Sequence, residues 1–301
     1  MRVISLLPSA TEIVDAIGGM DRVVGITHCC DEQPLAKSRV RVTRTAVDAT
    51  AAPGVIDAFV KELSSLGEPL YTLDEERITA LRPDLIITQA LCEVCAVRES
   101  DVQALATRLN PTPRIVTLAA TSLDAVLDDM RTVGAAMGLD AEAQTFIERA
   151  RARMLTVHET LKAAKAPRPR VAVIEWGDPI YAAGHWVPEM IKRAGGIDVL
   201  AKAGEHSVVV SHEQVRAADP DIIIYAPCGY DLEQSVIEGQ KLLSDSSWNW
   251  ARGKRIYALD ANAYVSRPGP RLVDGVEGFA RLFNPTLFTP LASGFARELT
   301  L

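Results

Sequence analysis

The residues of this chain that could bind a metal ion or an organic ligand are concentrated in five short segments. These segments are His28-Cys29-Cys30, Cys92 with Cys95, Glu175 to Trp186, Cys228 with Tyr230, and Tyr264 with Arg267. Imidazole and thiolate groups are good ligands for transition metals, whereas indole and phenol rings bury a large area against a flat ligand at low entropic cost. The residue types therefore indicate either a metal site or a surface for a large organic molecule.

Each of the five segments directly follows a predicted strand. Short apolar runs predict strands at residues 2–7, 22–27, 84–88, 114–118, 170–175, 221–225 and 255–259. Helical periodicity predicts helices at residues 8–17, 55–66, 73–81, 99–109, 122–137, 140–165, 187–194, 211–218, 231–243 and 270–283. Such alternation is typical of parallel α/β sheets, which bind ligands beyond the carboxyl ends of their strands. A single cysteine or ring usually only packs there, but five such segments together predict a binding site. The stretch 176–186 is predicted to be a loop.

A long helix-forming stretch at residues 140–165 separates the two sets of strands. Gly138 ends the preceding helix, and Pro167 prevents this one from continuing. About 25 residues at 1.5 Å each span roughly 37 Å, which is about the width of a domain. An ordinary helix packed on one core is one interpretation. A strut joining two lobes is the interpretation we favour, because the segments on its two sides have the same pattern.

An internal match supports the division into two lobes. Residues 76–87 (ERITALRPDLII) align without a gap with residues 213–224 (EQVRAADPDIII). Each segment predicts a helix that begins near a glutamate, ends before a proline and leads into a buried strand. We therefore predict an N-terminal α/β lobe at 1–120, a helical linker with the strut at 121–166, and a C-terminal α/β lobe at 167–301.

The composition excludes several classes of protein. The 301 residues are 48% hydrophobic and 24% charged, which is typical of an ordinary globular chain. A net charge of −7 argues against nucleic acid as the main partner. No apolar run approaches the length of a membrane span. The start of the chain, MRVISLLPSATEIV, has too short an apolar run for a signal peptide. We therefore expect a cytoplasmic protein, or a periplasmic one whose export signal has been removed.

The cysteines leave a catalytic alternative open. Cys92 and Cys95, together with His28 and its neighbouring cysteines, could form a tetrahedral zinc site or a redox dithiol. A CxxC pair is only half of a zinc motif, so a structural or ligand-contacting role is the more common reading. The sequence contains no GxSxG elbow, P-loop or GxGxxG motif. A zinc- or thiol-dependent enzyme built on His28, Cys92 and Cys95 therefore remains one alternative.

Longer motifs resemble those of the cobalamin-binding branch of the substrate-binding proteins that serve ABC importers. The motifs are VISLLPSATE (3–12), RVVGITH (22–28), ITALRPDLIITQ (78–89) with CEVCAV after it, EWGDP (175–179), AGHWVP (183–188) and SRPGPR (266–271). The resemblance implies a non-enzymatic protein with two Rossmann-like lobes bridged by one long rigid helix. It also implies cobalamin or a related corrinoid as the ligand, held in a cleft between the lobes. Relatives bind an iron-siderophore or haem, which are the alternative ligands.

The resemblance also assigns roles to individual residues. The expected ligand-binding residues are Pro8, His28, Cys92, Cys95, Glu175, Trp176, Tyr181, His185, Trp186, Tyr230, Tyr264 and Arg267. The aromatic rings suit stacking on a macrocycle, and Arg267 could meet an amide or phosphate oxygen. His28 or His185 could reach the cobalt, and the alternative is that both bond to the backbone or to the amide groups at the edge of the ligand. Glu76 and Glu213 are expected to dock against an ABC permease, one on each lobe. The segment from His28 to Asp31 reads HCCD where the family has HECD, which leaves the role of Cys29 open.

Overall fold

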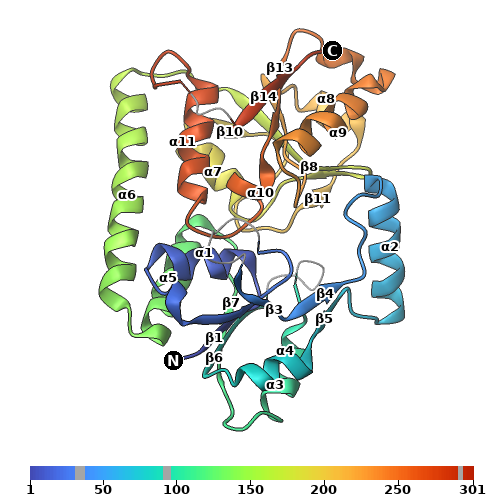
Figure 1. The fold of residues 1–301 in the computed structure, drawn as a ribbon. Coiled ribbons are helices and arrows are strands. Elements are labelled where there is room, and N and C mark those ends of the chain that lie inside the picture. The colour runs from blue at the N-terminus through green and yellow to red at the C-terminus, as the bar shows by residue number, and fades with distance from the viewer. Residues whose placement is uncertain (31–37, 91–95, 291–293) are drawn as a thin grey trace. The chain divides into compact units, whose positions relative to one another are not determined.

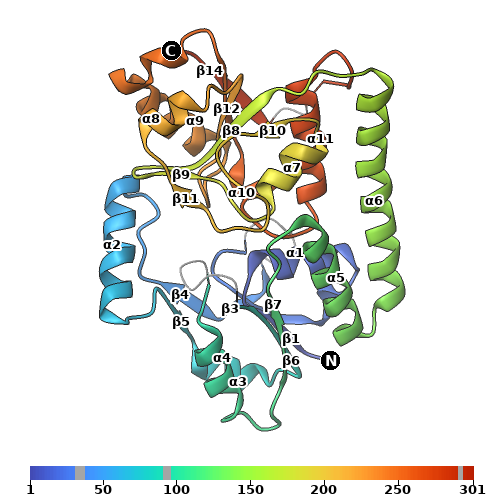
Figure 2. The same cartoon turned by 180° about the vertical axis from the view of Figure 1, so that it is seen from behind.

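The computed structural model describes residues 1–30, 38–90, 96–290 and 294–301. The chain forms two compact units, which are drawn with their elements labelled in Figures 1 and 2. The N-terminal unit consists of Met1–Ala120 and Asp124–Arg149, and the C-terminal unit of Thr121–Leu123 and Ala150–Leu301. The boundary at Arg149 falls inside one continuous helix, so residues from both units share that helix.

The N-terminal unit is built on a five-stranded parallel sheet with the order β3-β2-β1-β6-β7. Its strands are β1 (Val3–Ser5), β2 (Val23–Ile26), β3 (Val40–Arg41), β6 (Leu85–Gln89) and β7 (Arg114–Leu118). Two further strands, β4 (Thr43–Thr45) and β5 (Tyr71–Leu73), form a separate antiparallel pair. Its helices are α1 (Pro8–Ala16), α2 (Pro53–Leu66), α3 (Glu75–Leu81), α4 (Glu99–Ala106) and α5 (Leu123–Met137).

The C-terminal unit has a seven-stranded mixed sheet with the order β11-β9-β8-β12-β13-β14, and β10 also pairs with β8. The strands are β8 (Arg170–Gly177), β9 (Ile180–Ala182), β10 (Ile197–Asp198), β11 (Val208–Val209), β12 (Ile222–Tyr225), β13 (Arg255–Leu259) and β14 (Ala296–Leu299). The central pairs are parallel, whereas β9, β11 and β14 pair in the antiparallel sense. The helices are α7 (Val187–Arg193), α8 (His212–Ala217), α9 (Leu232–Ser244), α10 (Ala261–Tyr264) and α11 (Leu272–Phe283).

The central strands are buried because both faces of each sheet are covered. Every residue of β1 and of β12 is buried. Ile4 and Ile86 belong to the core of the N-terminal unit, and Ile174 and Ile223 to that of the C-terminal unit. Strands of this kind contain continuous apolar runs rather than alternating ones, which is why the sequence pattern locates them.

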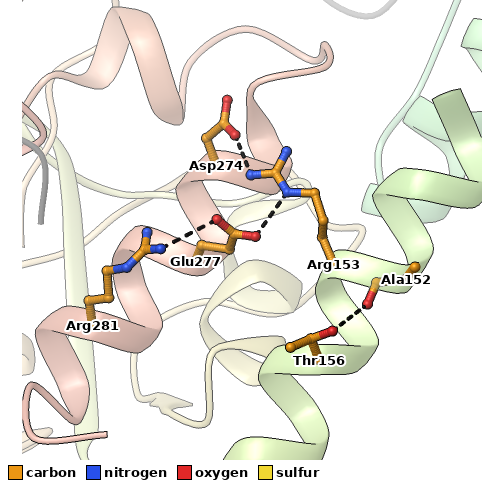
Figure 3. Close-up of polar contacts among 6 residues, drawn as sticks. All are labelled: Ala152, Arg153, Thr156, Asp274, Glu277 and Arg281. Atoms are coloured by element: carbon orange, nitrogen blue, oxygen red, sulfur yellow. Dashed lines mark hydrogen bonds and ion pairs between the residues drawn. The ribbon is translucent and has the colours of Figure 1, made fainter. Parts of the chain in front are cut away.

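The long predicted helix is confirmed as α6, which spans Asp140–Ala163. Its C-terminal part is fixed to α11 by ion pairs within the C-terminal unit (Figure 3). Arg153 donates from Nε to Glu277 at 2.9 Å and from Nη2 to Asp274 at 2.5 Å. Arg281 lies on the other side of Glu277, at 3.6 Å. The two carboxylates of α11 are therefore held by Arg153, with Arg281 as a second cation.

The prediction of a loop at 176–186 is wrong for residues 176–177 and 180–182, which belong to strands. Strand β8 continues to Gly177, the chain turns at Asp178-Pro179, and β9 returns in antiparallel pairing with β8. The turn residues fit a hairpin, but β9 has only three residues and shows no alternation long enough to predict a strand. Strands β11 and β14 were not predicted either.

Candidate functional site

In the C-terminal unit, three adjacent strands bring candidate residues to one edge of the sheet. Because β8, β12 and β13 are parallel neighbours, their carboxyl ends meet at this edge. The loop after β12 is joined to both neighbours. The backbone N–H of Cys228 donates to the carbonyl of Glu175 at 3.1 Å, and that of Asn262 donates to the carbonyl of Tyr230 at 3.0 Å. We call this edge the C-terminal rim.

An aromatic cluster lies on the C-terminal rim. The rings of Trp176 and Tyr230 meet edge to face, with their centroids 5.8 Å apart and an interplanar angle of 67°. Tyr181 lies opposite Trp176 in the register of the β8–β9 hairpin. Burial, with a smaller effect of Glu238, raises the pKa of Tyr230, so its hydroxyl stays protonated. Among the described residues, the buried indole nitrogen of Trp176 has no hydrogen-bond partner. The cluster thus offers ring surface and a buried N–H donor whose hydrogen bond is not satisfied by any described residue.

Two further expected residues follow β13 at the same edge. Asp260 caps α10 by accepting the N–H of Ala263 at 2.8 Å, and this cap precedes Tyr264. The ring of Tyr264 packs on Phe295 with centroids 4.8 Å apart. Arg267 is half-buried in the segment after α10. Both residues therefore lie in the segment that follows β13, the strand next to β12.

Trp186 has a different environment from the one expected for a stacking residue. It is only 6% exposed, and its indole N–H donates to the backbone carbonyl of Val265 at 2.7 Å. A tryptophan so buried and with its donor satisfied is part of the core. Trp186 therefore packs in the core at the start of α7.

His185 is paired with a histidine that the sequence analysis did not single out. Its Nε2 lies 3.1 Å from Nδ1 of His206, and the two ring planes are perpendicular. Burial, followed by the nearby His206, lowers the pKa of His185, which favours the neutral ring. No spacing rule connects residues 185 and 206, so only the fold reveals the pair.

In the N-terminal unit, Pro8 and His28 lie just beyond the carboxyl ends of the neighbouring strands β1 and β2. Pro8 is the first residue of α1. His28 is anchored by Thr43, whose hydroxyl oxygen lies 2.7 Å from Nδ1 and accepts the backbone N–H at 2.9 Å. Its ring stacks on that of Tyr71, with centroids 5.6 Å apart. Burial, and to a lesser extent Arg41, lowers the pKa of His28. These contacts engage Nδ1 rather than Nε2.

The structure does not test the cysteine cluster. Cys92 and Cys95 lie outside the described residues, and so does Asp31. Cys29 and Cys228 are exposed, whereas Cys30 is buried with its sulfur 3.0 Å from the hydroxyl of Thr11. Within the part of the chain that the structure describes, no group of three or more His, Cys, Asp or Glu side chains could hold a metal ion.

Glu76 and Glu213 occupy the same position in two helices. Each is the second residue of its helix, α3 or α8, and each is exposed. The helices are capped by Asp74 and Ser211. The backbone N–H of Glu213 and then the Ser211 hydroxyl lower the pKa of the Glu213 carboxyl. An open pocket of about 450 Å³ lies beside Glu213 and is lined in part by Arg216.

Two α/β units that share one long helix, with aromatic and histidine side chains beyond the strand ends, define a solute-binding protein. The chain belongs to the periplasmic binding protein family, whose model matches residues 3–263. Members of this family are substrate-binding proteins of the ABC-importer type and not enzymes, so the zinc- or thiol-dependent enzyme is not supported. Among the described residues, no helix has the length and apolarity needed to cross a membrane.

Several proteins are similar to this one over most of the chain. A cobalamin-binding protein of Halobacterium salinarum is 26% identical over 95% of this chain and 70% of its own length. A vitamin B12-binding protein of Vibrio cholerae is 24% identical over 92% of this chain and 86% of its own length. Among solved structures, a periplasmic haem-binding protein from Pseudomonas aeruginosa has a TM-score of 0.74 at 22% identity, covering 100% of this chain and 98% of its own. The periplasmic vitamin B12 binding protein of Vibrio cholerae has a TM-score of 0.62 at 24% identity, covering 94% and 96%. At these identities the structures show the fold alone.

Proposed function

We propose that this protein binds cobalamin or a related corrinoid reversibly. The observation that carries the proposal is the aromatic cluster of Trp176, Tyr181 and Tyr230 on the C-terminal rim. A corrin is a large flat ring with amide groups around its edge. Ring surface suits its face, and the buried N–H of Trp176 suits an amide oxygen. The two relatives named for cobalamin and vitamin B12 match more than nine-tenths of the chain, which supports the same ligand class.

Polar side chains complete the proposed binding surface. Arg267 carries a guanidinium that can donate a hydrogen bond to an amide oxygen or a phosphate oxygen of the ligand. Glu175, half-buried near the end of β8, can accept from an amide N–H. In the N-terminal unit, Pro8 and His28 occupy the corresponding place beyond the strand ends. We include His28 as a ligand for the metal, because its Nδ1 is held by Thr43 and its ring is kept neutral.

We further propose that the protein delivers its ligand to an ABC permease through Glu76 and Glu213. The support is their equivalent, exposed position at the start of α3 and α8. A carboxylate in a first helical turn is also favourable on its own, so position alone does not establish docking. Delivery to an importer requires the protein to act on the external face of the membrane. The proposal therefore favours a periplasmic location over the cytoplasmic one.

Haem is the second candidate ligand. The similarity in fold to a solved haem-binding protein and the tyrosine and histidine side chains beyond the strand ends favour it. Imidazole and phenolate are both common axial ligands of haem iron. The aromatic cluster fits either macrocycle, so the ligand class has to be decided by direct binding.

A calorimetric titration of the full chain decides between the candidates. Cyanocobalamin, haemin and a ferric siderophore are titrated separately, and the absorbance of each complex is recorded. We expect saturable binding of cyanocobalamin. In Trp176→Ala we expect a loss of about 1–3 kcal/mol, the range for a large buried side chain, which is roughly 5- to 150-fold in Kd.

Trp250→Ala is the matched control, because Trp250 precedes β13 and lies outside the C-terminal rim. Its affinity should equal that of the wild type. Binding of haemin or the siderophore without binding of cyanocobalamin would replace the ligand assignment. Equal affinity in Trp176→Ala and Trp250→Ala would reject the position of the site.

A further inference from the structure

Two histidine rings from separate segments of the C-terminal unit face each other. His185 Nε2 and His206 Nδ1 are 3.1 Å apart, and the ring planes meet at 90°. His206 is exposed, and His185 is half-buried. The two residues are far apart in the sequence, so the fold alone brings their nitrogen atoms together.

The backbone holds the two segments in close contact. The N–H of His185 donates to the carbonyl of Glu205 at 2.6 Å, and the N–H of Gly204 donates to the carbonyl of His185 at 2.8 Å. The N–H of Gly184 donates to the hydroxyl of Ser207 at 3.1 Å. A Cβ at Gly184 would lie 2.5 Å from the backbone nitrogen of Ser207, so only glycine fits there. His185 itself has φ +53°, an uncommon value for a residue with a side chain. The backbone segments that carry the two histidines are therefore held together whether or not a ligand is bound.

We propose that His185 and His206 form a binding site for a divalent transition-metal ion. Bonds of about 2.0–2.1 Å from one ion to two nitrogens 3.1 Å apart enclose an angle of about 100°. This angle lies between the values for neighbouring ligands of an octahedral and of a tetrahedral ion. The direction from each nitrogen to the ion departs by about 40° from the line between the nitrogens, so the rings must turn by a similar angle for the ion to replace the proton that they share.

The chemistry of the pair selects the class of ion. Neutral imidazole suits zinc, copper and nickel, whereas magnesium and calcium prefer oxygen ligands. No third His, Cys, Asp or Glu side chain completes a cluster with the pair among the described residues. Solvent therefore fills the remaining positions, as in sites with open coordination rather than closed structural ones. The exposure of His206 gives the ion access, and the site is an exchangeable one.

The structural alternative is a hydrogen bond that only ties the two segments together. It makes a different prediction, because such a bond stabilises the protein whether or not metal is present. A metal site adds stability only when the ion is bound. Corrinoid is left out of the test, so its outcome does not depend on the proposed function.

The test is a calorimetric titration of the full chain with Ni²⁺ alone. We expect about one Ni²⁺ per chain, with binding weakened on the order of tenfold or more in His185→Ala and in His206→Ala. His158→Ala, which removes an exposed histidine of α6, is the control and should bind as the wild type does. Mg²⁺ should not bind. Unchanged Ni²⁺ affinity in both variants, or equal binding of Mg²⁺, would overturn the proposal.

A second variant keeps the test valid if removal of His185 disturbs the fold. His206→Gln changes only the exposed partner and keeps a polar side chain. Ni²⁺ should raise the Tm of the wild type and leave that of His206→Gln unchanged. If His206→Gln lowers the Tm by the same amount with and without Ni²⁺, the pair is structural and the metal site is rejected.

Discussion

Asp84 and Asp221 make the same contact in the two units. Each carboxylate accepts the backbone N–H of the arginine at the start of a central strand, Arg2 at 2.7 Å and Arg170 at 2.8 Å. Each aspartate also donates its own backbone N–H to the carbonyl of that arginine, at 2.8 Å in both units. The agreement supports the division into two similar lobes that the aligned segments predicted, because it extends to contacts that no alignment reveals.

The same equivalence applies to Glu76 and Glu213, which precede these aspartates by the same number of residues. If both dock on a permease, Glu76→Lys/Glu213→Lys should abolish association with a reconstituted permease and leave corrinoid affinity intact. Wild-type association should weaken as salt screens the charges. A pull-down with the corrinoid-loaded protein measures the association with the permease.

The control for docking is Glu62→Lys/Glu298→Lys, which reverses the charge of one exposed glutamate in each unit at a different position. This variant has the same net charge as the docking variant and should still associate. If the Glu76/Glu213 variant associates as well as the control does, the two glutamates serve only their own helices.

The elements that the sequence predicted are those whose own residues show a clear pattern. Helices such as α6 and α11 are long enough for their periodicity to be visible, and strands such as β12 are apolar throughout because both faces are covered. Strands β9 and β11 have three and two residues, and β11 is exposed. Their hydrogen bonds depend on a neighbouring strand rather than on their own composition, so no pattern marks them.

The candidate site was also predicted only in part, because some of its contacts depend on neighbouring segments. Trp176 and Tyr230 were located because they follow predicted strands, and a parallel sheet brings strand ends together. His206 and Thr43 were not located from the sequence. The close backbone contact at Gly184 brings His206 to its partner, and the small β4–β5 pair brings Thr43 to His28. Trp186 was placed with the stacking rings because its position in the sequence does not show that its indole ring is buried and its N–H is hydrogen-bonded.

The ion-pair cluster between α6 and α11 provides a test of stability. Arg153→Ala leaves Asp274 and Glu277 close together with one cation fewer. Because Arg153 is partly exposed, we expect a loss of about 1 kcal/mol in the free energy of unfolding, smaller at high salt. Urea denaturation measures it. Arg151→Ala, an exposed arginine on the same helix, is the control, and an equal loss there would show that the cluster contributes nothing specific.

The carboxyl of Asp198 makes stability depend on pH. Burial raises its pKa to about 6, although its Oδ1 accepts the N–H groups of Leu200 at 2.9 Å and Ala201 at 2.8 Å. The folded state therefore binds a proton that the unfolded state releases, and stability falls as the pH rises from about 4 to about 6. The full difference is on the order of 2–3 kcal/mol.

Asp198→Asn keeps the Oδ1 acceptor and removes the charge. We expect it to be more stable than the wild type at pH 8 and equally stable at pH 4, as measured by urea denaturation at both values. A constant difference at the two pH values would show that the ionisation of Asp198 is not responsible.

The last prediction concerns whether a histidine reaches the cobalt. Thr43 engages Nδ1 of His28, and stacking on Tyr71 fixes the ring, so Nε2 is the nitrogen that can replace the water of aquocobalamin. We expect the visible spectrum of aquocobalamin to shift on binding and the shift to be lost in His28→Ala. His185→Ala tests the other expected histidine, and His158→Ala is the control.

The pH dependence distinguishes coordination by His28 from a contact with the edge of the ligand. Burial lowers the pKa of His28, so the neutral ring that coordinates metal persists to a lower pH than for an ordinary histidine. The spectral shift should therefore persist to a lower pH than it would with an ordinary histidine as the ligand, and disappear only on further acidification. A bound complex whose spectrum equals that of free aquocobalamin, or one whose shift is kept in both His28→Ala and His185→Ala, would exclude these histidines as ligands. The aromatic cluster would then hold the corrinoid by its faces and edges alone, and the His28→Ala variant would bind cyanocobalamin as tightly as the wild type does.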